Sequence, residues 1–451
     1  MLKRLLNFIT ARPGKPTTCG KLRVISRDHH NISRKNISPG VIRVIKQLIE
    51  AGYDAYLVGG GVRDLLLDGK PKDFDVATSA TPEQVRRLFR GARIIGRRFQ
   101  IVHVRMGRDI FEVTTFRGAG DDNPGSKRNQ EGMLLRDNVY GTLASDALRR
   151  DFTVNALYYS PIDFAVYDHT GGMEDLKKRT LRMIGDPVTR YKEDPVRMLR
   201  AIRFAGKLGF AIEPNTADPI HELGPLLQNI SEARLFEEVL KLFLGGSALA
   251  TFSLLRDYGL LAHLFPDTHN ALEAGDLLGL GVIEQTMSNT DKRIRSEKTV
   301  TPAFLYAAIL WPALQREKTR LMANMPEAAA HAQAAQQVVM RQLQRTSIPK
   351  RFSIPMREIW DLQLRLPQRG GMRALRLLDH PRFRAAYDFL LMRENAGEQL
   401  DGLGSWWTRF QGADDQEREE MVKALNKREA GSKPRRRRRP ASRNKPPADQ
   451  E

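Results

Sequence analysis

Apolar residues recur at helical spacing after residue 40 and then alternate with polar residues. In VIRVIKQLIEAG they occupy 41, 44, 45, 48 and 49, which predicts an amphipathic helix ending near Gly52. AYLVGG, FDVAT, IVHVRMG and DIFEVTTF predict strands, and TPEQVRRLF predicts a helix with Thr81 as N-cap and Pro82 in its first position. This part of the chain is therefore expected to form a small unit of mixed strands and helices.

Strand patterns stop after Tyr191, and helical spacing continues to about residue 395. The fold class is therefore predicted to be α+β, with a small mixed α/β head, a palm-like sheet with helices, before an extended all-helical neck and body. The predicted regions are a basic flexible arm (1–40), the head (41–185), a helical neck (186–255), a helical body (256–410) and a disordered basic tail (411–451).

The charge balance indicates a polyanionic partner. The chain contains 73 Lys and Arg against 53 Asp and Glu, a net charge of +20. The last twenty-one residues contain eight basic side chains, including the run Arg435–Arg439, against two acidic ones. Such a tail adds salt-sensitive contacts to RNA phosphates, although docking of a protein partner is the alternative reading.

The single cysteine, Cys19, excludes an internal disulfide and any cysteine-based zinc site. No apolar run approaches the roughly 18 residues that span a bilayer, and the apolar stretch near the start is too short for a signal peptide. We therefore expect a cytoplasmic protein without a membrane span.

Asp73 and Asp75 carry the strongest chemical signal. Side chains two apart on a strand share one face, so both carboxylates are predicted to lie together while Phe74 faces the core. Two carboxylates side by side on one strand face repel each other unless a cation lies between them. Hard oxygen ligands of this kind suit Mg²⁺, and two such ions can activate an attacking hydroxyl and stabilise leaving pyrophosphate.

Gly59, Gly60 and Gly61 follow a predicted strand and precede a predicted helix whose first turn contains Arg63. Backbone N–H groups in such a turn can receive a phosphate group, although a plain tight turn uses glycines as well. The sequence has no Walker A lysine pattern, which excludes a P-loop ATPase.

A two-metal site is expected to need a third carboxylate, and two candidates exist. Glu112 lies on a predicted strand, where it can share a sheet face with the aspartate pair. Asp151 follows Arg149 and Arg150, so a purely ion-paired role is open for it. We favour Asp151 as the essential acid and Glu112 as an additional candidate ligand, but the sequence does not separate them.

Asp194 and Arg197 stand three residues apart on one face of a predicted helix. The carboxylate can accept from an exocyclic amine while the guanidinium donates to the adjacent ring nitrogen, a pairing that fits adenine and cytosine. With Pro195 next in sequence, Asp194 is equally well placed to cap the helix. The pair therefore predicts either base selection or a simple helix start.

In combination, GGGVRD…DFDVAT, FEVTTFR, RRDFTVNALYY and EDPVRMLRAIRF resemble the class II nucleotidyltransferases, which comprise bacterial poly(A) polymerases and CCA-adding tRNA nucleotidyltransferases. The motifs occur in the family's order across residues 56–204. The resemblance implies a nucleotidyltransferase head, a neck that reads the base and a body that holds RNA. It implies Asp73 and Asp75 as metal ligands, Asp151 as the third acid, Gly59, Gly60 and Arg63 by the triphosphate, Arg149 and Arg150 beside it, and Asp194 and Arg197 at the base.

Residues 94–104, IIGRRFQIVHV, resemble the bacterial poly(A) polymerase branch, as do ARLFEEVLKLF and HPRFRAAYDFLLMR further on. The resemblance therefore implies addition of AMP from ATP to RNA 3′ ends with Mg²⁺, in RNA processing or decay and alongside RNA-decay proteins. Within the class, the alternative is CCA addition. Outside it, the alternative is a non-catalytic RNA-binding protein.

Overall fold

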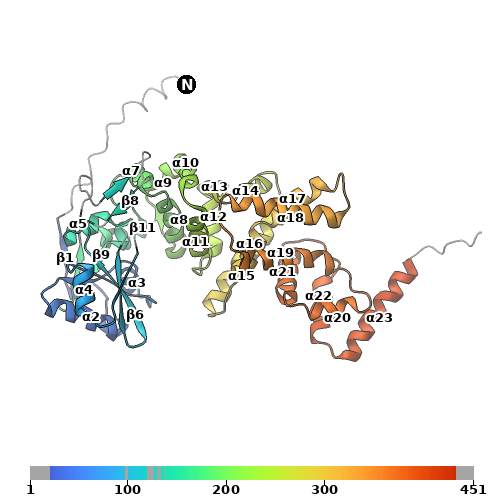
Figure 1. Cartoon of the computed structure of the whole chain (residues 1–451), viewed down its shortest axis with the longest axis horizontal. Helices are drawn as coiled ribbons and strands as arrows, with labels where there is room; N and C mark the ends of the chain where they lie inside the picture. The colour runs from blue at the N-terminus through green and yellow to red at the C-terminus, as the bar shows by residue number, and fades with distance from the viewer. Residues whose placement is uncertain (1–20, 97–99, 119–125, 129–133, 138, 433–451) are drawn as a thin grey trace, which may run out of the picture. The chain divides into compact units, whose positions relative to one another are not determined.

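The computed structural model describes residues 21–96, 100–118, 126–128, 134–137 and 139–432. They form two compact units (Figure 1). The first comprises the described residues up to Asn270 together with Met287–Val300 and Met340–Ile348. The second comprises Ala271–Thr286, Thr301–Val339 and the described residues from Pro349 on. The predicted head and neck thus belong to one unit, and the boundary between them remains a prediction.

A mixed eight-stranded sheet organises the first unit. Its central pair, β2 and β3, runs antiparallel, whereas β3 and β6 run parallel. In spatial order the strands are β1 (Arg23–Ile25), β10 (Val166–Asp168), β9 (Leu157–Tyr159), β2 (Ala55–Val58), β3 (Asp75–Thr78), β6 (Asp109–Thr115), β5 (Ile101–Met106) and β4 (Arg93–Ile95).

The helices beside the sheet begin and end where the sequence predicts. Helix α2 (Pro39–Glu50) buries Val41, Val44, Ile45 and Leu48 and is followed by Gly52, whose positive φ of 86° closes it. Helix α4 (Pro82–Leu88) begins with a reciprocal capping box between Thr81 and Gln84. Together with α3 (Gly60–Leu66), these helices confirm the predicted mixed α/β head.

The prediction of a flexible arm is wrong for residues 21–40. Strand β1 pairs with β10, which extends the sheet by one strand, and Ile32 and Ile37 are buried. The pairing partner lies more than 140 residues away in sequence, so local composition could not reveal it. Residues 1–20, including Cys19, lie outside the described residues.

Helices dominate the chain after β10. A short parallel pair, β11 (Thr180–Leu181) and β12 (Ala211–Ile212), extends strand structure slightly past Tyr191, where the sequence predicts helices only. A second small sheet pairs β7 (Ser126–Arg128) with β8 (Leu134–Asp137). Helices α5 to α15 are α5 (Leu143–Arg149), α6 (Gly172–Lys177), α7 (Pro187–Glu193), α8 (Val196–Leu208), α9 (Pro214–Ala217), α10 (Pro219–Leu223), α11 (Glu232–Phe243), α12 (Ala248–Asp257), α13 (Leu261–Leu264), α14 (Pro266–Glu273) and α15 (Leu277–Arg295).

The second unit has a helical core with buried tryptophans. Trp360 donates from its indole N–H to the carbonyl of Ala307 over 3.0 Å, and Trp407 donates to the carbonyl of Leu366 over 3.1 Å. These bonds satisfy the polar atom of each buried ring. The remaining helices are α16 (Pro302–Ile309), α17 (Trp311–Leu321), α18 (Glu327–Leu343), α19 (Lys350–Arg365), α20 (Arg373–Leu378), α21 (Phe383–Asn395), α22 (Leu403–Gly412) and α23 (Asp415–Ser432).

Helix α23 corrects the predicted start of the disordered tail. We expected order to end at residue 411, yet 415–432 are helical, and the partly buried Met421 and Val422 pack against the core of the second unit. Three large apolar residues, Met421, Val422 and Leu425, are too few in a highly charged helix of this length to produce a clear periodic signal. Residues 433–451, with the run Arg435–Arg439, lie outside the described residues. Among the helices of the described ranges, none is long and apolar enough to cross a bilayer.

Candidate active site

Asp73 and Asp75 lie where the chain enters β3. Phe74 between them is buried at 9% exposure, Asp75 is half-buried and Asp73 is exposed. The alternation follows from the pleat, which sends neighbouring side chains to opposite faces of the sheet. It places both carboxylates away from the core, as the sequence predicts.

Glu112 joins the pair from the neighbouring strand. In the parallel β3–β6 ladder, Asp75 stands in register with Glu112. Burial, the charge of Glu112 and that of Asp73 raise the pKa of Asp75 to about 6, while Arg150 acts in the opposite direction. Asp73, Asp75 and Glu112 are called the carboxylate site below. A bound cation would relieve the repulsion between these carboxylates.

Hard oxygen donors on a half-buried sheet edge fit a divalent cation. Within the described ranges, no group of three or more His, Cys, Asp or Glu residues is placed to hold a metal ion by itself. Mg²⁺ is usually coordinated by one or two protein carboxylates, with waters and substrate phosphates as its other ligands. A site with two carboxylate ligands is therefore typical for Mg²⁺. The residues therefore fit a cation that binds together with a phosphorylated substrate.

His103 faces Glu112 from the third strand. The two residues are in register on β5 and β6, and His103 Nε2 lies 3.5 Å from Glu112 Oε1. Both side chains are partly exposed. His103 therefore limits the positions that the glutamate carboxylate adopts, in keeping with the positioning or structural role that a lone strand histidine usually has.

The glycine turn before α3 opens toward the carboxylate site. Gly59 has φ of +76°, a conformation that residues with a side chain rarely adopt. A Cβ atom there would lie 3.5 Å from Arg150 Nη1 and 3.9 Å from Asp75 Oδ2. At Gly61 a Cβ would lie 3.2 Å from the Asp73 carbonyl oxygen. Because these positions have no side chain, the backbone of the turn can lie close to Arg150, Asp75 and the backbone of Asp73.

Arg150 is fixed in that space by two buried partners. Its Nε donates to the Tyr158 hydroxyl over 3.0 Å and its Nη2 donates to Asp146 over 3.2 Å. Burial disfavours the charged guanidinium, but Tyr158 and Asp146 outweigh it and raise the pKa of Arg150. Arg150 is therefore a permanent cation beside Asp75. Arg149 differs, because its Nη1 donates to the carbonyl of Gly118.

Asp151 points to the neck helix α8 and not to the carboxylate site. Its Oδ2 accepts from Arg200 Nε over 2.7 Å and from Nη2 over 2.5 Å, and its Oδ1 accepts from the Phe152 N–H. Burial alone would raise the pKa of Asp151, but Arg200 and these hydrogen bonds lower it to about 2. The structure therefore places Glu112, and not Asp151, beside the aspartate pair.

Arg63 is almost completely buried, at 2% exposure, and its guanidinium is fully engaged. It donates to Asp64 over 2.5 and 2.8 Å and to Asn155 Oδ1 over 2.6 Å. Its carbon Cζ lies 5.3 Å from the centre of the Phe204 ring of α8. In this structure Arg63 therefore supports the glycine turn from behind instead of facing the space in front of it.

Asp194 and Arg197 stand at the start of α8, each with a partner of its own. Asp194 Oδ2 accepts from Arg234 Nη2 over 2.8 Å, and its Oδ1 lies 3.4 Å from the Val196 N–H, a weak helix cap. Arg197 Nη1 donates to Glu193 over 2.8 Å. Asp194 ends α7 and Pro195 is the N-cap of α8, one residue later than the sequence predicts. The backbone N–H of Arg197 donates to the Asp194 carbonyl over 2.9 Å, but the two side chains are bonded to other partners. Base recognition therefore requires those partners to share or release the side chains.

Sequence reasoning missed the residues that hold the site in place. For Arg200 and Arg234 the partner is far away in the chain, 49 positions for Asp151 and 40 for Asp194. Asp146 and Tyr158 lie only four and eight residues from Arg150, so the i,i+4 spacing of Asp146 was a local signal that was not used. A signal existed for Asn155, which lies four residues after Asp151 within the quoted motif and donates weakly to it over 3.4 Å. Arg200 follows Arg197 by three residues, the spacing of one helix face.

Three family models match the chain. One described as "Poly A polymerase head domain" matches residues 55–182, and one described as "Probable RNA and SrmB- binding site of polymerase A" matches residues 209–272. A third, "Polymerase A arginine-rich C-terminus", matches residues 323–443. Together they cover the strands of the eight-stranded sheet except β1, a part of the helical region after it and most of the second unit.

The chain is 50% identical to "Poly(A) polymerase I" of Escherichia coli O6:H1 over 429 residues, which is 93% of this chain and 92% of that protein. It is 40% identical to a "CCA-adding enzyme" of Geobacillus stearothermophilus over 221 residues, about half of each chain. A solved structure of the Bacillus stearothermophilus CCA-adding enzyme in complex with CTP has a TM-score of 0.55 and 26% identity, covering 88% of this chain and 83% of that one.

Proposed function

The chain belongs to the bacterial poly(A) polymerase family of nucleotidyltransferases, and from that membership we propose that it adds AMP from ATP to the 3′ ends of RNA without a template. The resemblance predicted from the motifs is thereby confirmed. Identity of 50% over nearly the whole length of both chains supports poly(A) addition, whereas the CCA-adding relative matches only about half of this chain.

One observation carries the chemistry: Asp75 and Arg150 border the space in front of the Gly59 turn, and Glu112 stands in register with Asp75 on the neighbouring strand. We propose that Mg²⁺ is held there by Asp73 and Asp75, with Glu112 as the third carboxylate. When bound, the ion lowers the barrier to attack by the RNA 3′ hydroxyl and to departure of pyrophosphate. The carboxylates supply oxygen ligands, and their repulsion keeps the site ready for a cation.

The remaining residues orient the substrates. We assign Arg150 Nη1 and the backbone of Gly59 and Gly60 to the triphosphate, because they border the space next to Asp75. Asp194 and Arg197 are assigned to the base of the incoming nucleotide. Asp151 acts as a positioning residue: its bond to Arg200 ties the catalytic sheet to the helix that starts with the base-reading pair. Arg63 supports the turn from behind, and Arg149 braces the loop at Gly118.

We propose that RNA binds to the helical part of the chain, because the net charge of +20 on the whole chain favours a polyanion and a family model described as a probable RNA-binding site matches residues 209–272. In this proposal residues 41–185 form the catalytic head, 186–255 the neck and 256–410 the RNA-binding body. The arginine run 435–439 adds sequence-independent phosphate contacts. Cytoplasmic location and association with RNA-decay proteins follow from the same role.

An extension assay with each nucleotide separately tests the proposal. Purified protein is incubated with an arbitrary RNA, Mg²⁺ and either ATP or CTP, and the products are resolved by length. Long ladders with ATP alone are expected. Arrest after three additions that require CTP would instead identify CCA addition, the activity named for the structural relative with bound CTP.

The non-catalytic alternative predicts no incorporation with any nucleotide. The intact carboxylate site opposes it, because three repelling carboxylates have a cost that only a bound cation removes. Asp73→Ala is expected to abolish incorporation and leave RNA binding nearly unchanged. Survival of activity in that variant would refute the site assignment.

A further inference from the structure

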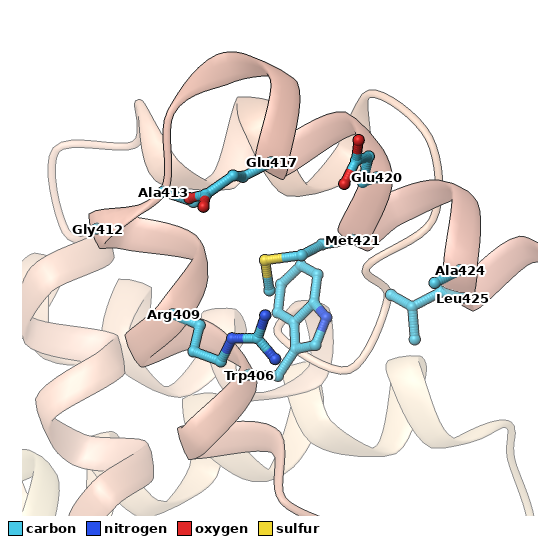
Figure 2. A pocket seen from close by; sticks show the side chains of 9 residues that line it. All are labelled: Trp406, Arg409, Gly412, Ala413, Glu417, Glu420, Met421, Ala424 and Leu425. Carbon is cyan, nitrogen blue, oxygen red and sulfur yellow. The ribbon is translucent and has the colours of Figure 1, made fainter.

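A groove between α22 and α23 lies within the second unit, apart from the residues assigned to catalysis (Figure 2). It encloses about 590 Å³. Trp406, Met421 and Leu425 give it an apolar floor, and Figure 2 shows Met421 beside the Trp406 indole with Glu417 and Glu420 on α23. Trp406 and Met421 also pack against the core of the second unit, but neither that packing nor the catalytic chemistry accounts for the acidic side chains at the open edge of the groove.

The two glutamates of the groove differ from the neighbouring acidic residues in their ion pairing. Residues 414–420 contain five acidic side chains and one arginine. Asp415 pairs with Arg418 at 3.3 Å and Glu419 pairs with Lys423 at 3.0 Å. Within the described part of the chain, Glu417 and Glu420 form no ion pair, although they stand three residues apart on one face of α23. Arg409 is the basic member of the lining and is also unpaired in the described chain.

An apolar floor with carboxylates at its edge fits arginine side chains. The aliphatic part of an arginine can pack on the apolar floor while its guanidinium binds a carboxylate at the edge. Two carboxylates on the same helix face can accept from two successive guanidinium groups. A nucleic acid would meet repulsion at the same edge.

The same chain supplies such a segment immediately after the groove. Residues 433–451 follow the last residue of α23 and contain eight basic and two acidic side chains, five of the basic ones in the run Arg435–Arg439. Glu420 lies twelve residues before Ser432, roughly 18 Å along the helix at 1.5 Å per residue. Arg439 lies seven residues after Ser432 and can span about 23 Å when extended. The end of the run therefore reaches the groove from its own attachment point.

We propose that the α22–α23 groove binds the end of the arginine run Arg435–Arg439 of the same chain. The docked run cannot contact RNA phosphates, so RNA must displace it, and the groove acts as an intramolecular brake on RNA binding. This consequence rests on the proposed RNA-binding role of the tail, whereas the docking itself does not.

Limited tryptic digestion of the full-length protein without RNA tests the docking. In about 50 mM salt, cleavage after residues 435–438 is followed by mass spectrometry, because trypsin does not cleave the bond between Arg439 and Pro440. The double variant Glu417→Gln with Glu420→Gln is expected to be cleaved roughly fivefold faster in the run than the wild-type chain, because two exposed ion pairs are lost. Asp415→Asn with Glu419→Gln removes the same charge from carboxylates that are already paired, and its cleavage rate should stay near that of the wild type.

Equal cleavage rates in the wild type and the groove variant would overturn the proposal. Protection that grows with protein concentration would also overturn it, because the groove would then hold the tail of a second copy. Neither result depends on catalysis, so failure of the docking and failure of the proposed activity can be told apart.

RNA affinity tests the brake separately. In the full-length chain, the groove variant should bind a short RNA a few times more tightly at low salt than the wild type. In a chain lacking residues 433–451, the same substitutions should leave the affinity unchanged. An equal gain in both backgrounds would show a general charge effect and contradict the brake. Weaker RNA binding caused by the two substitutions within the shortened chain would also contradict it, because the groove would then contribute to RNA binding itself.

Discussion

Two acidic centres lie close together in the first unit and differ in almost every respect. In the carboxylate site of Asp73, Asp75 and Glu112 the acids repel one another, and the pKa of Asp75 is raised to about 6. Asp151 forms an ion pair with Arg200, and its pKa is lowered to about 2. The same functional group therefore serves two purposes, and the neighbouring charges decide which. A repelling set is suited to receive a cation from solution, and a paired carboxylate is suited to hold two elements together.

Among these substitutions, Asp75→Asn should show most clearly that the carboxylate site serves catalysis and not stability. We expect incorporation to fall about 10³-fold or more, since the site loses metal binding where charge develops in the reaction. Thermal stability should remain the same or rise, because repulsion is relieved. Extension assays and thermal melts measure the two effects, with Asp109→Asn, an exposed carboxylate on the same sheet edge, as the matched control. A loss of stability equal to that of a core variant would contradict the assignment.

Glu112→Gln should separate the third-carboxylate candidates. We expect the Mg²⁺ concentration for half-maximal activity to rise about tenfold, with the melting temperature unchanged. Titration of extension rate against Mg²⁺ checks this. If Asp151→Asn shifts the Mg²⁺ requirement and Glu112→Gln does not, the third ligand is Asp151 after all.

Asp151→Asn should act chiefly on stability. The substitution leaves the Arg200 guanidinium without its partner, and we expect the free energy of unfolding to fall by about 2 kcal/mol, less than for a fully buried pair because Arg200 is 34% exposed. Denaturant unfolding provides the measurement. In the Asp151→Leu, Arg200→Met double variant most of that loss should be recovered; no recovery would mean that Asp151 stabilises the fold through groups other than Arg200.

The pH dependence of stability should have opposite signs at the two centres. The native pKa of Asp75 lies above its unfolded value of about 3.9, so the metal-free protein should lose stability as pH rises from about 4 to 6. The native pKa of Asp151 lies below that value, so its contribution should grow as pH rises from about 2 to 4. Melts in a chelating buffer, compared with Asp75→Asn and Asp151→Asn, isolate each slope. A wild-type slope that Asp75→Asn leaves unchanged between pH 4 and 6 would contradict the shift.

Gly59→Ala should produce the smallest effect. The added methyl group costs about 1 kcal/mol at positive φ and lies 3.5 Å from Arg150 Nη1, so we expect the KM for ATP to rise a few-fold. Gly52→Ala is the matched control, because Gly52 also has positive φ but a methyl group there would have no neighbour within 4 Å. Both variants should lose similar stability, and a KM change in both would show that strain alone is responsible.

The sequence predicts well those features of the structure that are set by neighbouring residues in the chain. Alternation around Phe74, the cap at Thr81 and the end of a helix at Gly52 depend on a few consecutive residues, and the structure has all three. The order of the motifs also sufficed to identify the family. Where local patterns were weak, prediction failed: β1 depends on a partner strand far along the chain, and α23 carries too few apolar residues to show a period.

Only the tertiary structure distinguishes the roles of the acids and arginines. From the sequence, Asp151 is the favoured third acid and Arg63 a triphosphate contact, yet the fold brings Arg200 onto Asp151, Asn155 onto Arg63 and Glu112 beside Asp75. Spacing along a strand or helix states which face a side chain occupies. It does not state which distant charge arrives on that face, and that charge determines whether a carboxylate waits for a cation or is already satisfied.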